Sequence, residues 1–149
     1  MDSYSYITIE EAIVIHRKTV ENSGGGTTLS IDNGKLESVL CNIQNDDYYP
    51  TFVDKVTHLF FCVCKFHCFA DGNKRIAITL STQFLLKNGY MLIARDFIVK
   101  MENISYHVAA GNINKVLLHK IMTSIFNGEY DIDEEIKLEI YNAIKDRER

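Results

Sequence analysis

The residues most able to do chemistry lie together in one run of nine, His67-Cys68-Phe69-Ala70-Asp71-Gly72-Asn73-Lys74-Arg75. An imidazole titrates near neutral pH, so His67 is a candidate general base that could take a proton from an attacking hydroxyl. Asp71 offers a carboxylate, the kind of oxygen ligand that the hard cation Mg²⁺ prefers. These residue types predict proton transfer beside a metal-bound anion.

The second half of this run has the features of a phosphate site. Gly72 lets the backbone curl so that successive N–H groups face one point, and a helix start adds further unpaired donors. Lys74 and Arg75 fall in the expected first turn of that helix, where exposed cations oppose the macrodipole at a cost of roughly 0.3 to 1 kcal/mol each. A bound phosphate would make the position of the two cations favourable, because both side chains can neutralise its oxygens.

Two other residues of the run are expected to shape the loop. Phe69 stands between polar positions, so we expect its ring to turn inward and anchor the loop to the core. Asn73 could bond its own backbone or donate to a phosphate, and both roles stay open. The alternative to a functional loop is a polar turn between two helices with solvated cations.

Helix signals surround the run on both sides. Thr8-Ile9-Glu10-Glu11 has the spacing of a capping box and starts a helix, which ends at Asn22-Ser23-Gly24-Gly25-Gly26. Thr51-Phe52-Val53-Asp54 repeats the signal ahead of the apolar helix that leads to His67. The other expected helices cover 34–44, 73–88, 96–110, 112–127 and about 133–148, and Gly89, Gly111 and Gly128 follow three of them.

These signals predict an all-α protein with the architecture of an orthogonal helix bundle. Tyr90 to Ile93 is the one weak strand candidate. Tyr48, Tyr49 and Pro50 precede the helix that leads to His67. They could form a small β flap that docks a target segment, or an ordinary surface loop.

The composition is that of a globular protein and disfavours several functional classes. Of the 149 residues, 46% are hydrophobic and 24% are charged, which predicts a single domain over 1–149 with one core. A net charge of -4 provides no positive field for nucleic acid or an anionic membrane, so direct binding to either is not expected. We find no signal-peptide pattern and no apolar run of membrane-spanning length, which predicts a cytoplasmic location.

The cysteines and the remaining histidines are expected to be structural. Four cysteines are too few for a disulfide scaffold, so reduced thiols are expected. Cys62 and Cys64 belong to a cluster of zinc ligand types with His67 and Cys68, but residues two apart on a helix point to different faces, which argues against zinc. The other histidines are scattered singly on helices, where packing or surface roles are expected. They are His16, His58, His107 and His119.

The run at 67–75 resembles the signature of the Fic/Doc (Fido) family, His-Pro-Phe-x-Asp/Glu-Gly-Asn-Gly/Lys-Arg. Ile9-Glu10-Glu11-Ala12, the glycine-rich loop and Val108-Ala109-Ala110-Gly111 are similar to the Doc (death-on-curing) branch, so the resemblance spans about residues 6 to 127. It implies an all-α Fic fold, Mg²⁺ as cofactor, and ATP or another nucleoside triphosphate as co-substrate. It also implies that His67 is the base, Asp71 holds the metal, and Gly72 to Arg75 surround the phosphates. The helix expected at about 133–148 is an extension outside it.

The run departs from the family signature at a few positions. Cys68 replaces the usual proline, which changes the stiffness of the loop. Lys74 replaces the glycine of adenylylating Fic enzymes, and Ile78 stands where those enzymes often carry a second arginine. Both of these changes are similar to Doc, whereas Gly72 stands where Doc itself tends to have alanine.

The resemblance therefore implies a Doc-like toxin that transfers a phosphoryl group from a nucleoside triphosphate to a Ser, Thr or Tyr hydroxyl of a target protein. A translation factor is among the candidate targets. The alternatives are a Fic-type protein adenylyltransferase (AMPylation) and a catalytically silent Fic-fold module that binds nucleotide or a partner. Because the chain lacks the self-inhibitory motif Ser/Thr-x-x-x-Glu-Gly/Asn, a separate antitoxin protein is the expected partner.

Overall fold

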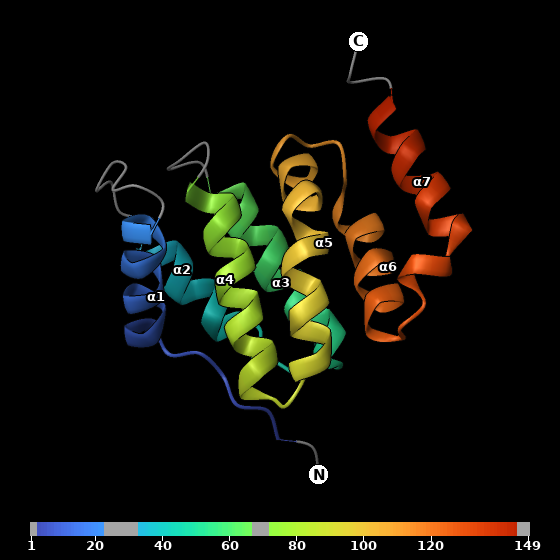
Figure 1. Ribbon diagram of the computed structural model, residues 1–149. Helices are drawn as coiled ribbons and strands as arrows, with labels where there is room; N and C mark the ends of the chain where they lie inside the picture. Colours follow the sequence, from blue (N-terminus) through green and yellow to red (C-terminus); the bar gives the residue numbers. More distant parts are fainter. Residues whose placement is uncertain (1–2, 23–32, 67–71, 146–149) are drawn as a thin grey trace.

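The computed structural model describes residues 3–22, 33–66 and 72–145, and within them the protein is all-α, as the sequence predicts (Figure 1). Seven α-helices and one 3₁₀ turn make up this part of the chain. They are α1 (Ile9–Asn22), α2 (Asn33–Asn42), α3 (Phe52–Lys65), α4 (Gly72–Lys87), α5 (Met91–Ala109), α6 (Lys115–Phe126), η1 (Tyr130–Ile132) and α7 (Glu134–Ile144). None of these helices combines the length and the apolar character that crossing a bilayer would need.

Local capping signals fix where several helices begin, as predicted. The Thr8 amide donates to Glu11 Oε1 at 3.2 Å, and the Glu11 amide donates back to Thr8 Oγ1 at 3.1 Å. Thr51 and Asp54 make the same reciprocal pair at the start of α3, at 3.1 and 3.0 Å. The predicted helix ends are also confirmed, since Gly89, Gly111 and Gly128 all have positive φ.

The start of α5 differs from the sequence prediction. The helix begins at Met91, so the weak strand predicted at Tyr90 to Ile93 is wrong, and the helix predicted over 96–110 starts five residues earlier than expected. A short apolar run does not distinguish a strand from a buried helix start. Here the ring of Tyr90 packs on that of Phe52, with 4.7 Å between the ring centroids, and this tertiary contact favours the helical arrangement.

The start of α6 and the segment before α3 also differ from the sequence prediction. Helix α6 begins at Lys115, three residues later than predicted, because Asn114 caps it by accepting from the Leu117 amide at 2.8 Å. Asn112 instead contacts His107 Nδ1 at 3.0 Å. The segment before α3 forms turns, and no strand occurs among the described residues, so the predicted β flap is absent from this part of the chain.

Helix α4 lies at the centre of the bundle and packs on α3, α5 and α1 (Figure 1). Its side chains facing these helices are almost all fully buried: Ile76, Ala77, Leu80, Ser81, Phe84 and Leu85. At its C-terminal end the Asn88 amide group donates to the Ser5 carbonyl at 2.9 Å, and its Oδ1 accepts from the Ser5 amide at 2.8 Å. Helix α7 packs on α6, away from α4.

A buried lysine ties the turn segment after α2 to helix α3. The Lys55 side chain is fully buried, and its Nζ donates to the Ile43 carbonyl at 2.8 Å and to Asp46 Oδ1 at 2.7 Å. The rings of Tyr4 and Tyr6 lie 5.9 and 5.6 Å from this ammonium. Burial lowers the pKa of Lys55, but hydrogen bonds to Asp46 and Tyr6 outweigh it, so the pKa is raised and the side chain stays charged.

We expect Lys55→Met to destabilise the protein by about 1 to 3 kcal/mol, because it keeps the apolar stem but leaves the buried Ile43 carbonyl without its donor. Urea denaturation at neutral pH measures the difference. Asp46→Asn is the matched control: the Asp46 side chain is 76% exposed, so this change should cost about 1 kcal/mol or less. Equal stability of Lys55→Met and the wild type would contradict the role of the ammonium.

Candidate functional site

The motif run begins just after α3 and ends in the first turn of α4. Helix α3 ends at Lys65, where the Phe66 amide donates to the Val63 carbonyl at 3.2 Å, and α4 begins at Gly72. The predicted base His67, the predicted anchor Phe69 and the predicted metal ligand Asp71 lie outside the described residues. Their roles therefore stay predictions from the sequence.

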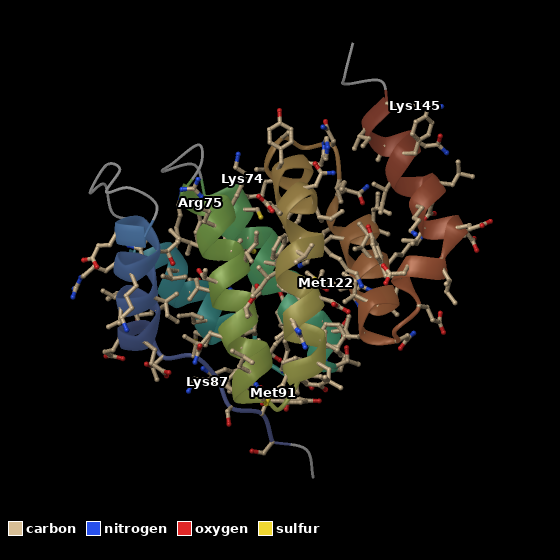
Figure 2. All side chains as sticks on the ribbon, in the orientation of Figure 1. Lys74, Arg75, Lys87, Met91, Met122 and Lys145 are labelled. Carbon is tan, nitrogen blue, oxygen red and sulfur yellow. The ribbon has the colours of Figure 1, made fainter. Side chains whose placement is uncertain are left out.

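The first turn of α4 is made of the other four motif residues. Gly72, Asn73, Lys74 and Arg75 are its first residues, so the predicted helix start within the motif is confirmed. This turn contains no acidic residue. The amide groups of a helix N-terminus, which have no partner within the helix, and two cations thus lie together at one end of α4, opposite the end that carries Lys87 (Figure 2).

Lys74 extends toward helix α5. It is half-buried, and its Nζ lies 5.0 Å from the centroid of the Tyr106 ring, within the range of a cation–π interaction. Burial raises the pKa of the nearby Cys64 thiol to about 12, although the positive charges of Lys65 and Lys74 lower it by a smaller amount. The Cys64 thiol is therefore protonated at neutral pH and is no candidate nucleophile.

Arg75 is exposed and lines a cavity of about 490 Å³ between α1, α4 and α5. Ile78 lies on the same wall, one helical turn after Arg75. Sequence reasoning missed the two other walls, because Lys18 on α1 and Glu102 on α5 come from segments with no spacing relation to the motif. The full lining is Ile15, Lys18, Thr19, Arg75, Ile78, Thr79, Gln83, Ile98 and Glu102.

A second group of titratable side chains surrounds His58 on α3. Tyr49 Oη lies 3.2 Å from His58 Nε2, with the two rings stacked at 4.4 Å, and Lys115 Nζ lies 2.7 Å from Nδ1. Cys62 Sγ is 3.6 Å from Nε2. The sequence showed only the four-residue step from His58 to Cys62. Tyr49 is thus held against α3, whereas Tyr48 of the predicted flap is 77% exposed.

The imidazole of His58 is neutral at physiological pH. Burial, and then the charge of Lys115, lower its pKa from 6.5 to about 4. A neutral ring whose Nδ1 accepts from Lys115 carries its proton on Nε2, and that N–H can donate to Tyr49. The group joins the segment before α3 to α3 and α6.

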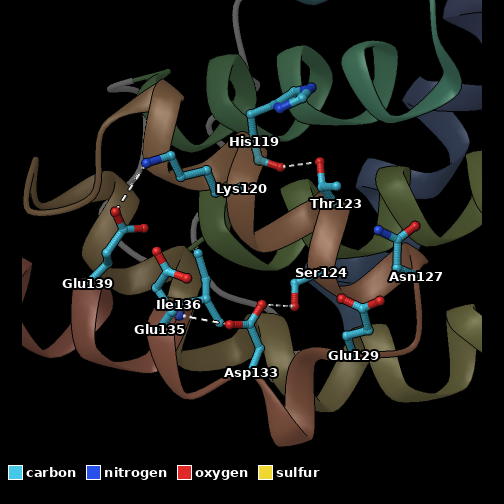
Figure 3. Close-up of a pocket in the computed structure, with 10 residues that line it drawn as sticks. All are labelled: His119, Lys120, Thr123, Ser124, Asn127, Glu129, Asp133, Glu135, Ile136 and Glu139. Atoms are coloured by element: carbon cyan, nitrogen blue, oxygen red, sulfur yellow. Dashed lines mark hydrogen bonds and ion pairs between the residues drawn. The ribbon is translucent and has the colours of Figure 1, made fainter.

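A polar cavity of about 460 Å³ lies between α6 and the final helix (Figure 3). Four of its polar side chains bind one another in pairs: Lys120 Nζ donates to Glu139 Oε1 at 3.1 Å, and the Ser124 hydroxyl donates to Asp133 Oδ2 at 2.9 Å. Asp133 Oδ1 also accepts from the Ile136 amide at 3.0 Å, which caps α7. These bonds join α7 to α6, and no predicted site residue lines the cavity.

Comparison with known proteins identifies the family to which this chain belongs. Residues 6–85, more than half of the chain, match the Fic/DOC family. The chain therefore belongs to the Fic/DOC family, which supports a Fic-type transferase.

A particular relative lies in the branch that the sequence resembles. The chain is 31% identical over 88 residues to "Protein kinase doc" of Escherichia phage P1, an alignment that covers 56% of this chain and 68% of the phage protein. No solved structure resembles the chain closely enough to count as a match.

We expect the His58 group to make stability depend on pH. The folded pKa of about 4 lies below the ordinary value of 6.5, so between these values only the unfolded state takes up the proton, and stability falls as the pH drops. Because the half-buried ring is partly screened by water, we expect a loss on the order of 2 kcal/mol. His58→Gln should remove this part of the loss. Urea midpoints of both proteins between neutral pH and pH 4 test it, and parallel pH profiles would contradict it.

Proposed function

We propose that this chain is a Doc-like protein phosphotransferase, which moves a phosphoryl group from a nucleoside triphosphate to a hydroxyl side chain of a target protein. The observation that carries the proposal is the first turn of α4. It begins inside the motif, and it presents helix-terminal amides and two cations with no acidic residue among them. The similarity to a protein named as a kinase supports the same reaction class.

In this proposal each motif residue has a separate task. His67 takes the proton from the attacking hydroxyl, and Gly72 to Arg75 bind and orient the phosphates. Asp71 would hold Mg²⁺, whose charge stabilises phosphate oxygens when it is bound. A carboxylate that directly precedes a turn with two cations fits a metal shared with phosphate. Because phosphoryl transfer needs little covalent chemistry from the protein, positioning and charge neutralisation dominate the rate.

Two residues favour phosphoryl transfer over nucleotidyl transfer. Lys74 occupies the position at which adenylylating relatives have glycine, and its ammonium extends toward Tyr106. Ile78 occupies the position of their second arginine, and it gives the wall beside Arg75 an apolar surface. A site without that arginine has less charge to bind an extended phosphate chain in the orientation that nucleotidyl transfer needs.

We further propose that the target is a protein, that the enzyme acts in the cytoplasm, and that a separate antitoxin protein inhibits it. The absence of a self-inhibitory motif in the sequence supports an inhibitor in trans. If the chain can be expressed at a high level in a bacterium without harm and without any inhibitor, the toxin assignment is contradicted.

The central experiment is incubation of the protein with a bacterial lysate, Mg²⁺ and ATP labelled either at the γ-phosphate or on the adenine. We expect protein-bound label only from the γ-phosphate. Label from adenine would assign nucleotidyl transfer instead, and no label with either ATP, despite nucleotide binding, would indicate a silent module. His67→Ala should reduce transfer by about 10²-fold or more and leave nucleotide binding largely intact, because general base catalysis contributes factors of this size.

Arg75→Ala should weaken binding of Mg²⁺–ATP by roughly 10-fold or more, since it removes a charged hydrogen-bond donor to phosphate. Isothermal titration calorimetry measures this change. Arg17→Ala is the matched control, because Arg17 is an exposed arginine on α1 that does not line the cavity. Equal losses for the two variants would point to a general charge effect and would contradict a phosphate site at α4.

A further inference from the structure

The outward face of α5, coloured yellow in Figure 1, carries a line of exposed apolar side chains. Leu92, Val99 and Tyr106 are seven residues apart, and their exposed fractions are 84%, 74% and 54%. Two turns of an α-helix take about seven residues, so the three side chains lie on one stripe along the helix. Single exposed apolar residues are common, but three in line at seven-residue steps can contact a second helix that runs along the same line.

One side of this stripe carries two opposite charges. Successive residues of a helix turn by about 100°, which places Arg95 and Glu102 on the same side, about 40° and 60° around the helix from Val99. They are seven residues and about 10 Å apart along the axis, so they cannot form the ion pair that is usual between residues three or four apart on a helix. Neither forms an ion pair with another of the described residues.

The other side of the stripe carries Asp96 and Asn103, about 60° and 40° from Val99. Asp96 already lies 3.7 Å from Lys100 in the same helix. The pattern is nearly symmetric about Val99: an apolar residue lies seven positions away in each direction, and the two sides carry matching polar pairs.

We propose that α5 binds α5 of a second copy of this chain, antiparallel and related by a two-fold axis at Val99. With such an axis, the side of one helix that carries Arg95 and Glu102 lies beside the same side of the second helix, and the two helices run in opposite directions. Val99 then meets its own copy, and Leu92 meets Tyr106 of the second copy. Arg95 meets Glu102 of the second copy at both ends of the contact, and Asn103 can donate to Asp96 on the other side.

The resulting dimer is expected to be weak. A single pair of helices buries less than the roughly 1,200–2,000 Å² of a stable complex, so the dimer should form in a concentration-dependent way. It would cover the Tyr106 ring on which Lys74 rests, and so place the second copy beside the first turn of α4. Val99 lies outside both the motif and the cavity beside Arg75, so a variant at this position tests the dimer separately from the proposed phosphotransferase activity.

Sedimentation velocity of the full chain over concentrations up to about 1 mM tests the dimer. Val99→Glu should weaken it by 10-fold or more, because two carboxylates would meet at the two-fold axis. Val116→Glu is the matched control: Val116 is also an exposed valine, at 68%, but it lies on α6. If the chain is monomeric throughout, or if both variants weaken the dimer equally, the proposal is overturned. Circular dichroism of each variant establishes that it is folded.

A charge exchange tests the antiparallel direction. Arg95→Glu and Glu102→Arg should each weaken the dimer, because like charges then meet at both ends, and the double variant should restore it to within a few-fold. If Asp96→Arg rescues Arg95→Glu instead, the two helices run parallel and the proposed geometry is wrong. Activity on labelled ATP, measured in Val99→Glu, shows whether the phosphotransferase proposal stands when the dimer proposal does not, because Val99 does not line the cavity beside Arg75.

Discussion

The position of the motif depends on the burial of helix α4. This helix packs on α3, α5 and α1, and side chains such as Ile76, Leu80 and Phe84 have no exposed surface. Moving a helix with so many fully buried groups would open cavities that cost several kcal/mol, so its direction and rotation are fixed. The first turn cannot be buried in the same way, because its amides have no partners within the helix. Packing therefore holds these donors rigidly at the edge of the bundle, which is the condition for a precise anion site.

Helix α5 extends this rigid frame on one side. Tyr106 provides the ring under Lys74, and Glu102 and Ile98 form part of the wall beside Arg75. Both contacts follow from the packing of α5 on α4, since residues three or four apart on α5 face the first turn of α4 and the cavity next to it. A change in the position of α5 would thus alter the surroundings of both cations together.

Local sequence signals were sufficient for most of the helices and for the motif. Thr8 with Glu11 and Thr51 with Asp54 start helices through contacts within four residues, and a glycine after a helix ends it for a local reason. The start of α5 was missed because it depends on Tyr90 packing against Phe52, a contact between distant segments. The His58 group and the cavity beside Arg75 were missed for the same reason, since their members come from three different parts of the chain. A family motif held within one loop can be recognised from its spacing, but a group of side chains assembled by packing cannot.

The first turn of α4 differs from the first turns of other helices in how its cations are neutralised. Lysines occur in the first turns of other helices, and three of them have an acceptor on a neighbouring segment. Lys55 donates to the Ile43 carbonyl, Lys115 lies against His58 Nδ1, and Lys137 donates to the Asp131 carbonyl. In each case a protein acceptor offsets the unfavourable position of the cation.

Arg75 does not follow this pattern. No other first turn in the described part of the chain carries two cations, and Arg75 is exposed, with no ion pair to another described residue. A guanidinium at a helix N-terminus is repelled by the positive end of the helix dipole. Three lysines of other first turns have acceptors that offset this repulsion, whereas Arg75 has none among the described residues. An anion that binds the helix amides and this guanidinium removes the penalty at both. The first turn of α4 thus departs from the usual charge preference of a helix, and a buried helix fixes its position. This departure is the physical reason why we propose that the phosphates of a nucleotide bind there.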